Sequence, residues 1–565
     1  MHSHDWLSAC RALVVLLLST GLLPATYAYA QPMLPGAVQP GRDRPLPEIP
    51  TQPELDFRLL APEPSPVPRS VDELRFRLND IRIEGATKLP TDRFRPLYAN
   101  LIGTDVTLVD LRAVADGIER DYRAAGYFLV RAFVPAQRVQ GGIFTINVVE
   151  GFVATVTVEG SNEATQAITR SYLSPLLAEK PASLETIERG LLLADDIPGI
   201  VATGLLRPSP SVPGASDLIV SELQPPLNGG LAVSNRGSDF TGVWTVTGDA
   251  AINGLFGPDQ LSAALTASPR SFEQIIGQAR YRRAIGSEGM IGSVFFTIAR
   301  GEPGSTLSVL NIETDSWAVG PRLSFPVIRS RAETLVVEGG LTFQDARVRV
   351  LGAGLSHDEW RVFDIGVSYL RNGWLNANWT ASIDLARGLP GLGGTQSNSP
   401  SLSRIGGQTD FTKVVGSFRV TRPIAGAFGI TLRAQGQYSF DPLITGEQIT
   451  FGGTQIGRGY DPGAITGDRG LAGSAELHYD FRFPEEAIQA MQPYAFVDGA
   501  KTWYIRNAAG IPGHASLGSA GLGIRLWLRY NFSFAVEVSR TLSAVPGSDN
   551  GKRATKVLMD ARVNF

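Results

Sequence analysis

The C-terminal part of the chain, from Leu227 to Phe565, consists of short runs in which apolar and polar residues alternate. Glycine, asparagine, aspartate and proline separate the runs and helical periodicity is absent, which is typical of strands joined by turns. Since successive side chains of a strand point to opposite faces, each such strand carries one apolar and one polar face. The last run is the most regular, with apolar Val557, Met559, Ala561, Val563 and Phe565 alternating with polar Lys556, Asp560, Arg562 and Asn564; only Leu558 breaks the pattern. The segment is therefore predicted to be all-β.

Two-faced strands suit either a soluble β-sandwich or a barrel in a membrane. At about 20 residues per strand and turn, residues 227–565 provide roughly 16–17 strands, which a closed membrane barrel accommodates. The mean hydropathy of +0.02 fits strands whose alternating faces dilute hydropathy. The chain also ends on Phe565, an aromatic residue of the kind found at the membrane interface. We therefore predict a transmembrane β-barrel of about 16 antiparallel strands over residues 227–565.

Residues 1–30 are predicted to be a signal peptide. Arg11 is followed by the apolar run Ala12–Leu23 and then by the small-residue site Ala28-Tyr29-Ala30, the order of a secretory leader. A run of about a dozen residues is too short to span a bilayer, which needs about 20. Cleavage after this site removes Cys10, the single cysteine of the chain. The mature protein is thus expected to be exported and free of cysteine.

A proline-rich linker is predicted over residues 31–70. Its eleven prolines, all between Gln31 and Pro68, exclude a continuous helix and favour an extended, solvated chain. The preferred interpretation is a passive spacer, and the alternative is docking against another part of the molecule. Within this linker, only the stretch Glu54–Leu60 has helical periodicity.

An internal repeat precedes the β-rich part. Ile81–Gly85 (IRIEG) recurs 75 residues later as Val156–Gly160 (VTVEG), and each copy is an alternating strand ended by glycine. An amphipathic helix follows each copy; the first begins at Asp110, placed as the N-cap, and the second follows Ser183. A strand pair closes each copy, residues 128–134 with 144–149 in the first and 201–206 with 217–223 in the second. The repeat predicts two small tandem α/β modules, over residues 75–150 and 151–225.

Motifs for catalysis are not found. The sequence contains no nucleophile–base pair, no phosphate loop and no metal-ligand spacing, so we expect no enzyme activity, no cofactor and no metal. A net charge of −3 argues against a nucleic-acid partner.

One glycine-rich segment of the β-rich part stands out from its strands. Phe451–Gly463 holds too many glycines for a stable strand, which predicts a loop in which Arg458 lies between glycines. Further along, Phe496-Val497-Asp498-Gly499 places a lone acid in a strand. A carboxylate that faces the lumen of a barrel needs a partner, and Arg458 can supply a bidentate one.

Together these features resemble the two-partner secretion transporters, the outer-membrane family of haemolysin activators and filamentous-haemagglutinin exporters. The first module resembles a POTRA domain of that family at Phe76–Ile81, Tyr122–Tyr127 and Arg131–Pro135, and the second resembles its partner POTRA at Leu191–Gly199. The barrel matches at Val233–Ser238 in the first strand, Arg458-Gly459-Tyr460 in the sixth extracellular loop and Phe496–Gly499 in an inner-wall strand. The resemblance covers nearly all of the chain after the linker.

The resemblance implies a 16-stranded barrel in the outer membrane of a Gram-negative bacterium, surrounded by lipid, with both POTRA domains in the periplasm. These domains would capture a cognate exoprotein, a large β-helical adhesin or haemolysin, which crosses the barrel unfolded and folds outside without ATP. The loop with Arg458, Gly459 and Tyr460 would fold back into the lumen and meet Asp498, next to Phe496 and Gly499. Phe565 would be the C-terminal signal for the barrel-assembly machinery. Gly457 stands where the family often has Val or Ile, which implies a more flexible loop tip.

Capture of the exoprotein is expected through strand addition to a POTRA edge, because backbone bonding accepts many sequences. Side-chain pockets would lie near Asp110 and near the strand that contains Phe144, Ile146 and Val148. Two other functions stay open at this stage. A barrel-assembly factor shares the loop motif but generally resembles chains with more POTRA repeats, and a passive porin has no role for tandem periplasmic modules.

Overall fold

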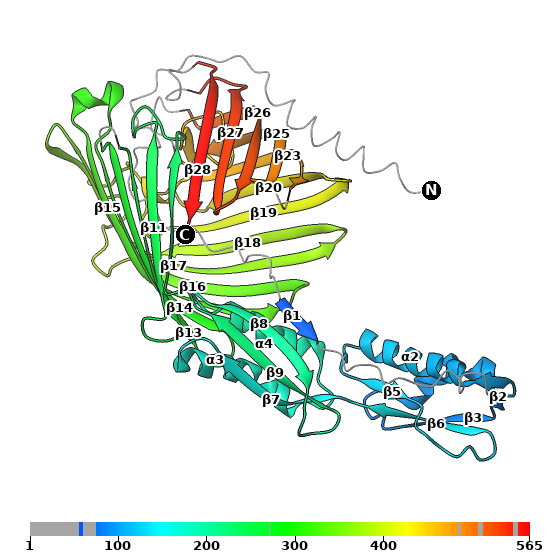
Figure 1. The fold of residues 1–565 in the computed structure, drawn as a ribbon. Coiled ribbons are helices and arrows are strands. Elements are labelled where there is room, and N and C mark those ends of the chain that lie inside the picture. The colour runs from blue at the N-terminus through cyan, green and yellow to red at the C-terminus, as the bar shows by residue number, and fades with distance from the viewer. Residues whose placement is uncertain (1–55, 60–74, 270–271, 484–486, 507–511, 546–551) are drawn as a thin grey trace.

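The computed structural model describes most of the chain from the second half of the linker onward. The described residues are 56–59, 75–269, 272–483, 487–506, 512–545 and 552–565. The predicted signal peptide therefore lies outside them, as does all of the predicted linker except residues 56–59. Two α/β modules precede a barrel, and Figure 1 shows the second module against one end of the barrel with the first module farther away.

The first module packs one long helix against small sheets. Its elements are β2 (Arg75–Arg77), β3 (Asp80–Glu84), η3 (Thr91–Leu97), η4 (Ala99–Leu101), β4 (Asp105–Thr107), α2 (Leu108–Ala124), β5 (Arg131–Phe133) and β6 (Ile143–Val149). Strand β6 lies between β3, which runs parallel to it, and β5, which runs antiparallel. The apolar face expected for the helix is buried, and Leu111, Ile118 and Tyr122 of α2 are fully enclosed. This face contributes much of the module's hydrophobic core.

The start of helix α2 differs from the sequence prediction. Thr107, not Asp110, is the N-cap; its hydroxyl accepts from the Asp110 amide, while the Asp110 carboxylate accepts from the Thr107 amide at 2.7 Å. This is a capping box, in which two helix-start N–H groups are satisfied reciprocally. Both residue types favour N-caps, so the sequence alone placed the cap three positions late.

The second module repeats the order with two helices over one sheet. Its elements are β7 (Phe152–Glu159), α3 (Glu163–Ala178), α4 (Leu184–Asp195), β8 (Val201–Pro208) and β9 (Ala215–Leu223). The linker adds a fourth strand, β1 (Asp56–Leu59), parallel to β8, which gives the order β1-β8-β9-β7. For these four residues the passive-spacer interpretation is wrong and the alternative, docking against another part of the molecule, is confirmed; they are extended rather than helical. Alternating strands and short helical runs cannot be distinguished over four residues.

The two glycines that end the repeated strands have the same structural reason. Gly85 and Gly160 have φ angles of +86° and +104°, a region that other residues rarely adopt. A Cβ would stand 2.1 Å from the Val148 carbonyl oxygen at Gly85, and 2.2 Å from that of Glu222 at Gly160. Both modules therefore require glycine where the chain leaves the first strand.

The remaining residues form a closed antiparallel barrel. Its first strands are β10 (Leu227–Ser234), β11 (Thr245–Asn253), β12 (Asp259–Ala267), β13 (Gln274–Ile285), β14 (Met290–Gly301), β15 (Glu313–Arg329), β16 (Glu333–Val350) and β17 (Ala353–Trp374). The others are β18 (Ala377–Gly388), β19 (Thr412–Ala425), β20 (Phe428–Ser439), β23 (Arg469–Tyr479), β24 (Phe481–Arg482), β25 (Ile488–Trp503), β26 (His514–Leu528), β27 (Phe532–Thr541) and β28 (Thr555–Asn564). Strands β23 and β24 both pair with β25, so among the described residues the wall has the 16 strands expected.

The wall closes where the first strand meets the last. Strand β10 pairs with β28 from Gly230↔Asn564 to Ser234↔Asp560, only five positions, whereas it pairs with β11 over eight. Beyond β10 the side chain of Asn235 continues the contact, because its amide bonds the Val557 carbonyl at 3.0 Å and the Met559 N–H at 2.6 Å. Side chains thus extend a short backbone junction.

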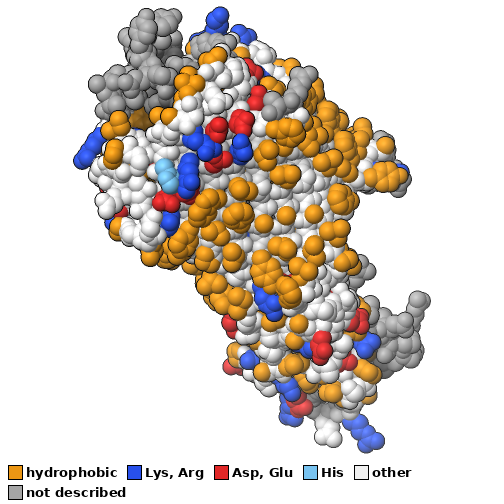
Figure 2. Space-filling view, turned by 90° about the vertical axis from the view of Figure 1, so that its left-hand side faces the viewer, with side chains coloured by type: hydrophobic (Ala, Val, Ile, Leu, Met, Phe, Trp, Pro, Cys, Tyr) orange, Lys and Arg blue, Asp and Glu red, His pale blue; other side chains and the backbone are white. Residues whose placement is uncertain are grey.

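The two faces of the barrel strands differ as the alternation predicts. Figure 2 shows apolar side chains spread over the outer wall, with charged groups gathered toward both ends of the molecule. Large apolar residues exposed on this wall include Leu265, Ile298, Leu323, Ile365, Ile383, Leu471 and Leu522. Charged residues such as Glu476, Asp498 and Glu537 face inward and are buried. An apolar exterior around a polar interior is the arrangement of a barrel in lipid. Among the described helices, none has the length and hydropathy to cross a bilayer.

Ion pairs connect the second module to the barrel. Asp196, at the end of α4, accepts two hydrogen bonds from Arg329 at 2.7 and 2.6 Å. Glu188 of the same helix pairs with Arg331 at 3.0 Å, in the turn between β15 and β16. This turn therefore lies at the end of the barrel that faces the second module, and its ion pairs hold α4 there.

Candidate functional site

A long loop between β20 and β23 turns back into the barrel. Its stem is the pair β21 (Ile449–Phe451) and β22 (Ile465–Gly467), preceded by η6 (Thr445–Glu447). Phe451, Ile456 and Tyr460 of the loop are buried with Ala472, Ala500 and Leu517 of the barrel wall in one apolar cluster. The predicted glycine-rich loop is thus not solvated. Its apolar side chains hold it against strands β23, β25 and β26.

Arg458 lies at the tip of this loop and is only 4% exposed. Its Nε lies 3.2 Å from Asp498 Oδ2, its Nη1 2.8 Å from Glu476 Oε2 and its Nη2 3.2 Å from Ser474 Oγ. The guanidinium carbon also stands 3.4 Å from the centre of the Phe496 ring. An arginine fits this seat because its planar group carries several donors and stacks on aromatic rings.

Three buried carboxylates from strands close together in the wall surround the guanidinium. They belong to Glu476 on β23, Asp498 on β25 and Glu537 on β27, the last 3.5 Å from Arg458 Nη1. Arg525 of β26 makes two bonds to Glu476, at 2.8 and 3.0 Å. Charges buried at this density are stabilised only when they are paired in this way.

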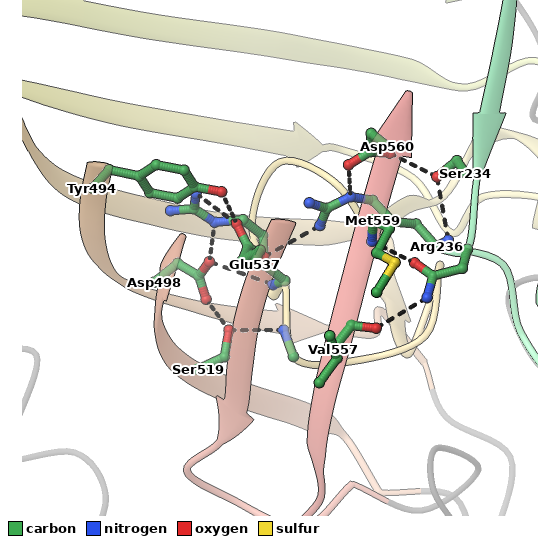
Figure 3. Close-up of polar contacts among 12 residues, drawn as sticks. Ser234, Arg236, Tyr494, Asp498, Ser519, Glu537, Val557, Met559 and Asp560 are labelled. Atoms are coloured by element: carbon green, nitrogen blue, oxygen red, sulfur yellow. Dashed lines mark hydrogen bonds and ion pairs between the residues drawn. The ribbon is translucent and has the colours of Figure 1, made fainter. Parts of the chain in front are cut away.

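The network continues to the junction of the first and last strands. Arg236, just after β10, donates to Glu537 at 3.2 Å and to Asp560 of β28 at 2.7 Å. The Tyr494 hydroxyl donates to Glu537 at 2.8 Å. Figure 3 shows Glu537 between these groups, with Asp498 and Ser519 on one side and Asp560 and Ser234 on the other. Arg236 is the arginine of the motif Val233–Ser238, and these contacts show what it binds.

The two residues after Arg458 fix the rest of the loop tip. Gly459 donates its N–H to Ser519 Oγ at 3.2 Å, and a Cβ there would stand 3.1 Å from Ser519 Cβ. The Tyr460 hydroxyl lies 2.8 Å from the Gly518 carbonyl and 2.7 Å from the Ser543 carbonyl. Asp461 then pairs with Lys556 of β28 at 2.5 Å. Glycine allows the close approach to Ser519, and the Tyr460 hydroxyl bonds the loop to β26 and to the residues just after β27.

The structure separates the predicted wall residues into two groups. Phe496 and Asp498 face the lumen and contact Arg458, whereas Gly499 alternates to the outer face of β25. Phe565 follows β28 and is 69% exposed, and its backbone exchanges two hydrogen bonds with Gly229 of β10, at 2.9 and 3.0 Å. Phe565 therefore extends the junction of the first and last strands, next to the start of β10.

The residues of the first module named from the sequence lie in its core and at a helix start. Phe144, Ile146 and Val148 are at most 5% exposed and belong to the core beneath α2, and a polypeptide-binding pocket near this strand stays a prediction. The alternate positions of β6, Ile143 and Val149, are the exposed ones. Asp110 serves the helix start, where hydrogen bonds from Thr107 lower its pKa. Period two identifies the two faces of a strand but not which face the helix covers.

The sequence prediction also missed most of the lumenal network. The sequence alone assigns no contact to Glu476, Arg525, Glu537 and Tyr494, although all four are polar positions in alternating strands, and it indicates Arg236 only as part of a motif. The sequence could have indicated these residues only as titratable side chains on the polar face of an alternating strand. That signal recurs in many strands, so only the register of the wall shows which of these residues meet.

The described residues also include one group with metal-ligand types, Asp345, His357 and Glu359 on β16 and β17. Arg347 donates to His357 Nε2 at 3.0 Å and to Asp345 at 3.2 Å. The arginine therefore already binds two of the three side chains that could hold a metal. The arrangement is an ion-pair ladder of the outer wall rather than a ligand set.

Comparisons with known proteins agree with this architecture. A family model described as haemolysin secretion/activation protein ShlB/FhaC/HecB matches residues 214–526, and a ShlB-type POTRA domain model matches residues 76–151. The chain is 21% identical to the heme/hemopexin transporter protein HuxB of Haemophilus influenzae, over 83% of this chain and 84% of that protein. It is 24% identical to the outer membrane transporter CdiB of Dickeya dadantii, over 72% of each chain. The solved structure of CdiB from Escherichia coli shares the fold with a TM-score of 0.66, at 21% identity and covering 90% of this chain and 93% of that one.

Proposed function

The chain belongs to the family of haemolysin secretion/activation proteins (ShlB/FhaC/HecB), and we propose that it exports one cognate polypeptide through its barrel. The family model matches more than half of the chain, and the relatives are named as transporters. The barrel lies in the outer membrane, with the POTRA modules in the periplasm. Two-partner secretion is the function that this architecture supports best.

The partner we propose is a large secreted exoprotein of the β-helical adhesin or haemolysin type. One relative is named hemolysin transporter protein HpmB, from Proteus mirabilis, with 23% identity over 82% of each chain. The periplasmic modules supply extended strand edges, and such edges bind unfolded polypeptides through the backbone. Insertion of this barrel would use the barrel-assembly machinery, which reads the strand end at Phe565.

The observation that supports the proposal most directly is the position of Arg458 in the lumen, where wall residues bind its guanidinium. A loop from the outer end of the barrel occupies the interior, and its guanidinium contacts three carboxylates from the wall. A polypeptide that crosses the barrel must pass or displace this loop. We therefore assign Arg458, Gly459 and Tyr460, with Phe496 and Asp498, as the residues that set the resting position of the loop.

Displacement of the loop has to be reversible for repeated export. Breaking one side of a buried ion pair costs about 3–5 kcal/mol, because it leaves a charge without a partner. In this lumen Arg525 remains bonded to Glu476, and Arg236 and Tyr494 remain bonded to Glu537. The carboxylates that Arg458 leaves thus keep other partners, which lowers the cost of moving the loop.

Secretion of a candidate partner tests the proposal directly. A candidate partner, such as a large exported protein if one is encoded beside this gene, would be produced with and without this chain, and its amount in the medium measured. We expect release only in the presence of this chain. Equal release without it would refute the proposed function. Uptake of small solutes in the same cells separates this function from that of a passive porin, which would conduct solutes without any effect on release.

A further inference from the structure

Strand β8 of the second module would be an edge strand without the linker. Its sheet has the order β1-β8-β9-β7, so β1 covers one side of β8. The register runs in parallel from Asp56↔Thr203 to Leu59↔Leu206. An uncovered edge presents unpaired N–H and C=O groups that readily accept another strand. Residues 56–59 therefore occupy a strand-binding position on the module.

The module keeps β8 in place independently of β1. On its other side β8 pairs with β9 over eight positions, from Val201↔Leu223 to Pro208↔Ser216. Ala202 and Leu206 of β8 are buried in the core of the module. The covering strand, by contrast, pairs over four positions only. Removal of β1 would leave a complete β8 with an open edge.

The sequence around β1 limits how strongly it can hold this edge. Pro50 and Pro53 precede the segment, and Pro62, Pro64 and Pro66 follow it. Proline has no backbone N–H to donate to a strand ladder, so the pairing cannot spread far in either direction. A longer strand without proline can make more backbone hydrogen bonds to β8, which is itself eight residues long.

The covered edge lies near the entrance of the barrel. Asp196 and Glu188 of α4 hold the second module to the turn between β15 and β16. Figure 1 shows β1 beside this module, on the side toward the barrel. A polypeptide bound along β8 would therefore be held next to the opening through which it must pass.

We propose that the edge of β8 binds an extended segment of the exported polypeptide in parallel orientation, and that Asp56–Leu59 occupies this edge until the segment displaces it. This inference rests on the proposed export function. The partner is recognised by its chemistry, a proline-free β-forming stretch with free backbone groups. The competing interpretation is that β1 is a permanent cover that protects the edge from aggregation.

A reversible tether distinguishes the two. The single cysteine is Cys10, in the predicted signal peptide, so an Asp56→Cys/Thr203→Cys pair introduces the two thiols of the mature chain at opposed positions of the register. We expect the oxidised pair to reduce secretion about tenfold or more, and reductant to restore it. The matched control is Val201→Cys/Leu223→Cys, a pair opposed across β8 and β9, which stay together in either interpretation. Full secretion by the oxidised Asp56/Thr203 tether overturns the inference.

A peptide probe tests the edge without the exoprotein. The probe is a fluorescent peptide with the sequence of residues 54–60 (ELDFRLL), and the full chain carries Phe57→Pro with Arg58→Pro to weaken β1. We expect the variant to bind the peptide at least about tenfold more tightly than the unmodified chain, because the competing strand is lost. A peptide with the same two prolines should not bind.

The two experiments fail differently from the proposed function. If the unmodified chain releases no partner, the export function fails, yet the peptide still reports whether the edge accepts a strand. Equal peptide binding by the variant and the unmodified chain means that the edge is not exchanged, and overturns the inference while the export function stands.

Discussion

Arg458 and Asp498 are joined twice, through the side chain and through the backbone. The guanidinium Nε lies 3.2 Å from Asp498 Oδ2, and the Arg458 amide nitrogen lies 3.4 Å from the same oxygen. The other carboxylate oxygen accepts from Ser519, whose Oγ also accepts from the Gly459 amide. Loop tip and wall thus form a closed ring of hydrogen bonds that fixes one position of the loop.

Replacing Arg458 should impair export but not assembly. Arg458→Ala removes the contacts to Glu476, Asp498 and Ser474 and leaves the backbone pairing of the wall intact. We expect release of the partner to fall about tenfold or more, since a buried partner is lost. Heat-modifiable mobility on gels would show that the barrel still forms. Arg300→Ala is the control, because Arg300 forms an exposed pair with Glu302 on the outer wall. Normal release by Arg458→Ala would remove the role assigned to this loop.

Exchanging the two charges should fail to restore export. The combination Arg458→Asp with Asp498→Arg would be expected to work if the pair were isolated. In the structure a carboxylate at position 458 would also face Glu476 and Glu537, now 2.8 and 3.5 Å from the arginine. Like charges at this separation repel in a site of low dielectric. Release by the double variant should be no higher than by either single variant, and substantial recovery would show that Asp498 alone determines the seat.

The space at Gly459 should be more sensitive than that at Gly499. A Cβ at Gly459 meets Ser519 Cβ at 3.1 Å and the Arg540 backbone at 3.2 Å, whereas at Gly499 its nearest neighbour is 3.4 Å away. Gly459→Val should therefore unseat the loop at a cost of about 1–3 kcal/mol. Faster cleavage of residues 452–464 by external protease would report this change. Gly499→Val, on the outer face, should leave cleavage unchanged, and equal rates for the two variants would contradict the assignment.

The stability of the first module should fall in acid through Glu150. Burial raises the pKa of its carboxyl, but hydrogen bonds from Thr87, Lys88 and Tyr122 outweigh burial, so the pKa lies below its ordinary value. A group with a lowered pKa in the folded state stabilises fully above its unfolded pKa of about 4.3, and this contribution is lost as pH falls through the folded pKa.

Hydrogen exchange of the Thr87 and Lys88 amides, which donate to Glu150 at 2.7 and 2.8 Å, would measure this effect. After correction for intrinsic rates, protection should decrease below about pH 4.3 in the natural chain. In Glu150→Gln it should be weaker at neutral pH and should change little over the same range. Protection that stays constant in the natural chain over this pH range would show that the Glu150 carboxylate does not stabilise these amides.

The parts of the fold that could be predicted from the sequence are those that depend on the local periodicity of apolar residues. Alternation along β28 and the apolar face of α2 are local properties, so the barrel and the first helix could both be predicted. The strand β1 could not, because four residues between prolines do not show which edge they pair with. Its partner, β8, begins at Val201, 142 positions after β1 ends at Leu59, and only folding brings the two together.

The candidate site shows the same limit. Arg458 was predicted to meet Asp498 because a lumenal carboxylate needs a partner and a family motif named both. Glu476 and Glu537 join them only because β23, β25 and β27 stand at the right register and spacing in the closed wall. Such contacts depend on strand order and shear, which a linear pattern does not contain.

The position of Glu537 has a mechanical consequence. Its two oxygens contact Arg458 of the loop and Arg236 beside the first strand, and Arg236 also grips Asp560 on the last strand. The loop in the lumen and the junction between the first and last strands therefore share one side chain. The Arg236 contact uses a different oxygen of Glu537 from the Arg458 contact, so displacing the loop leaves the contact across the junction in place.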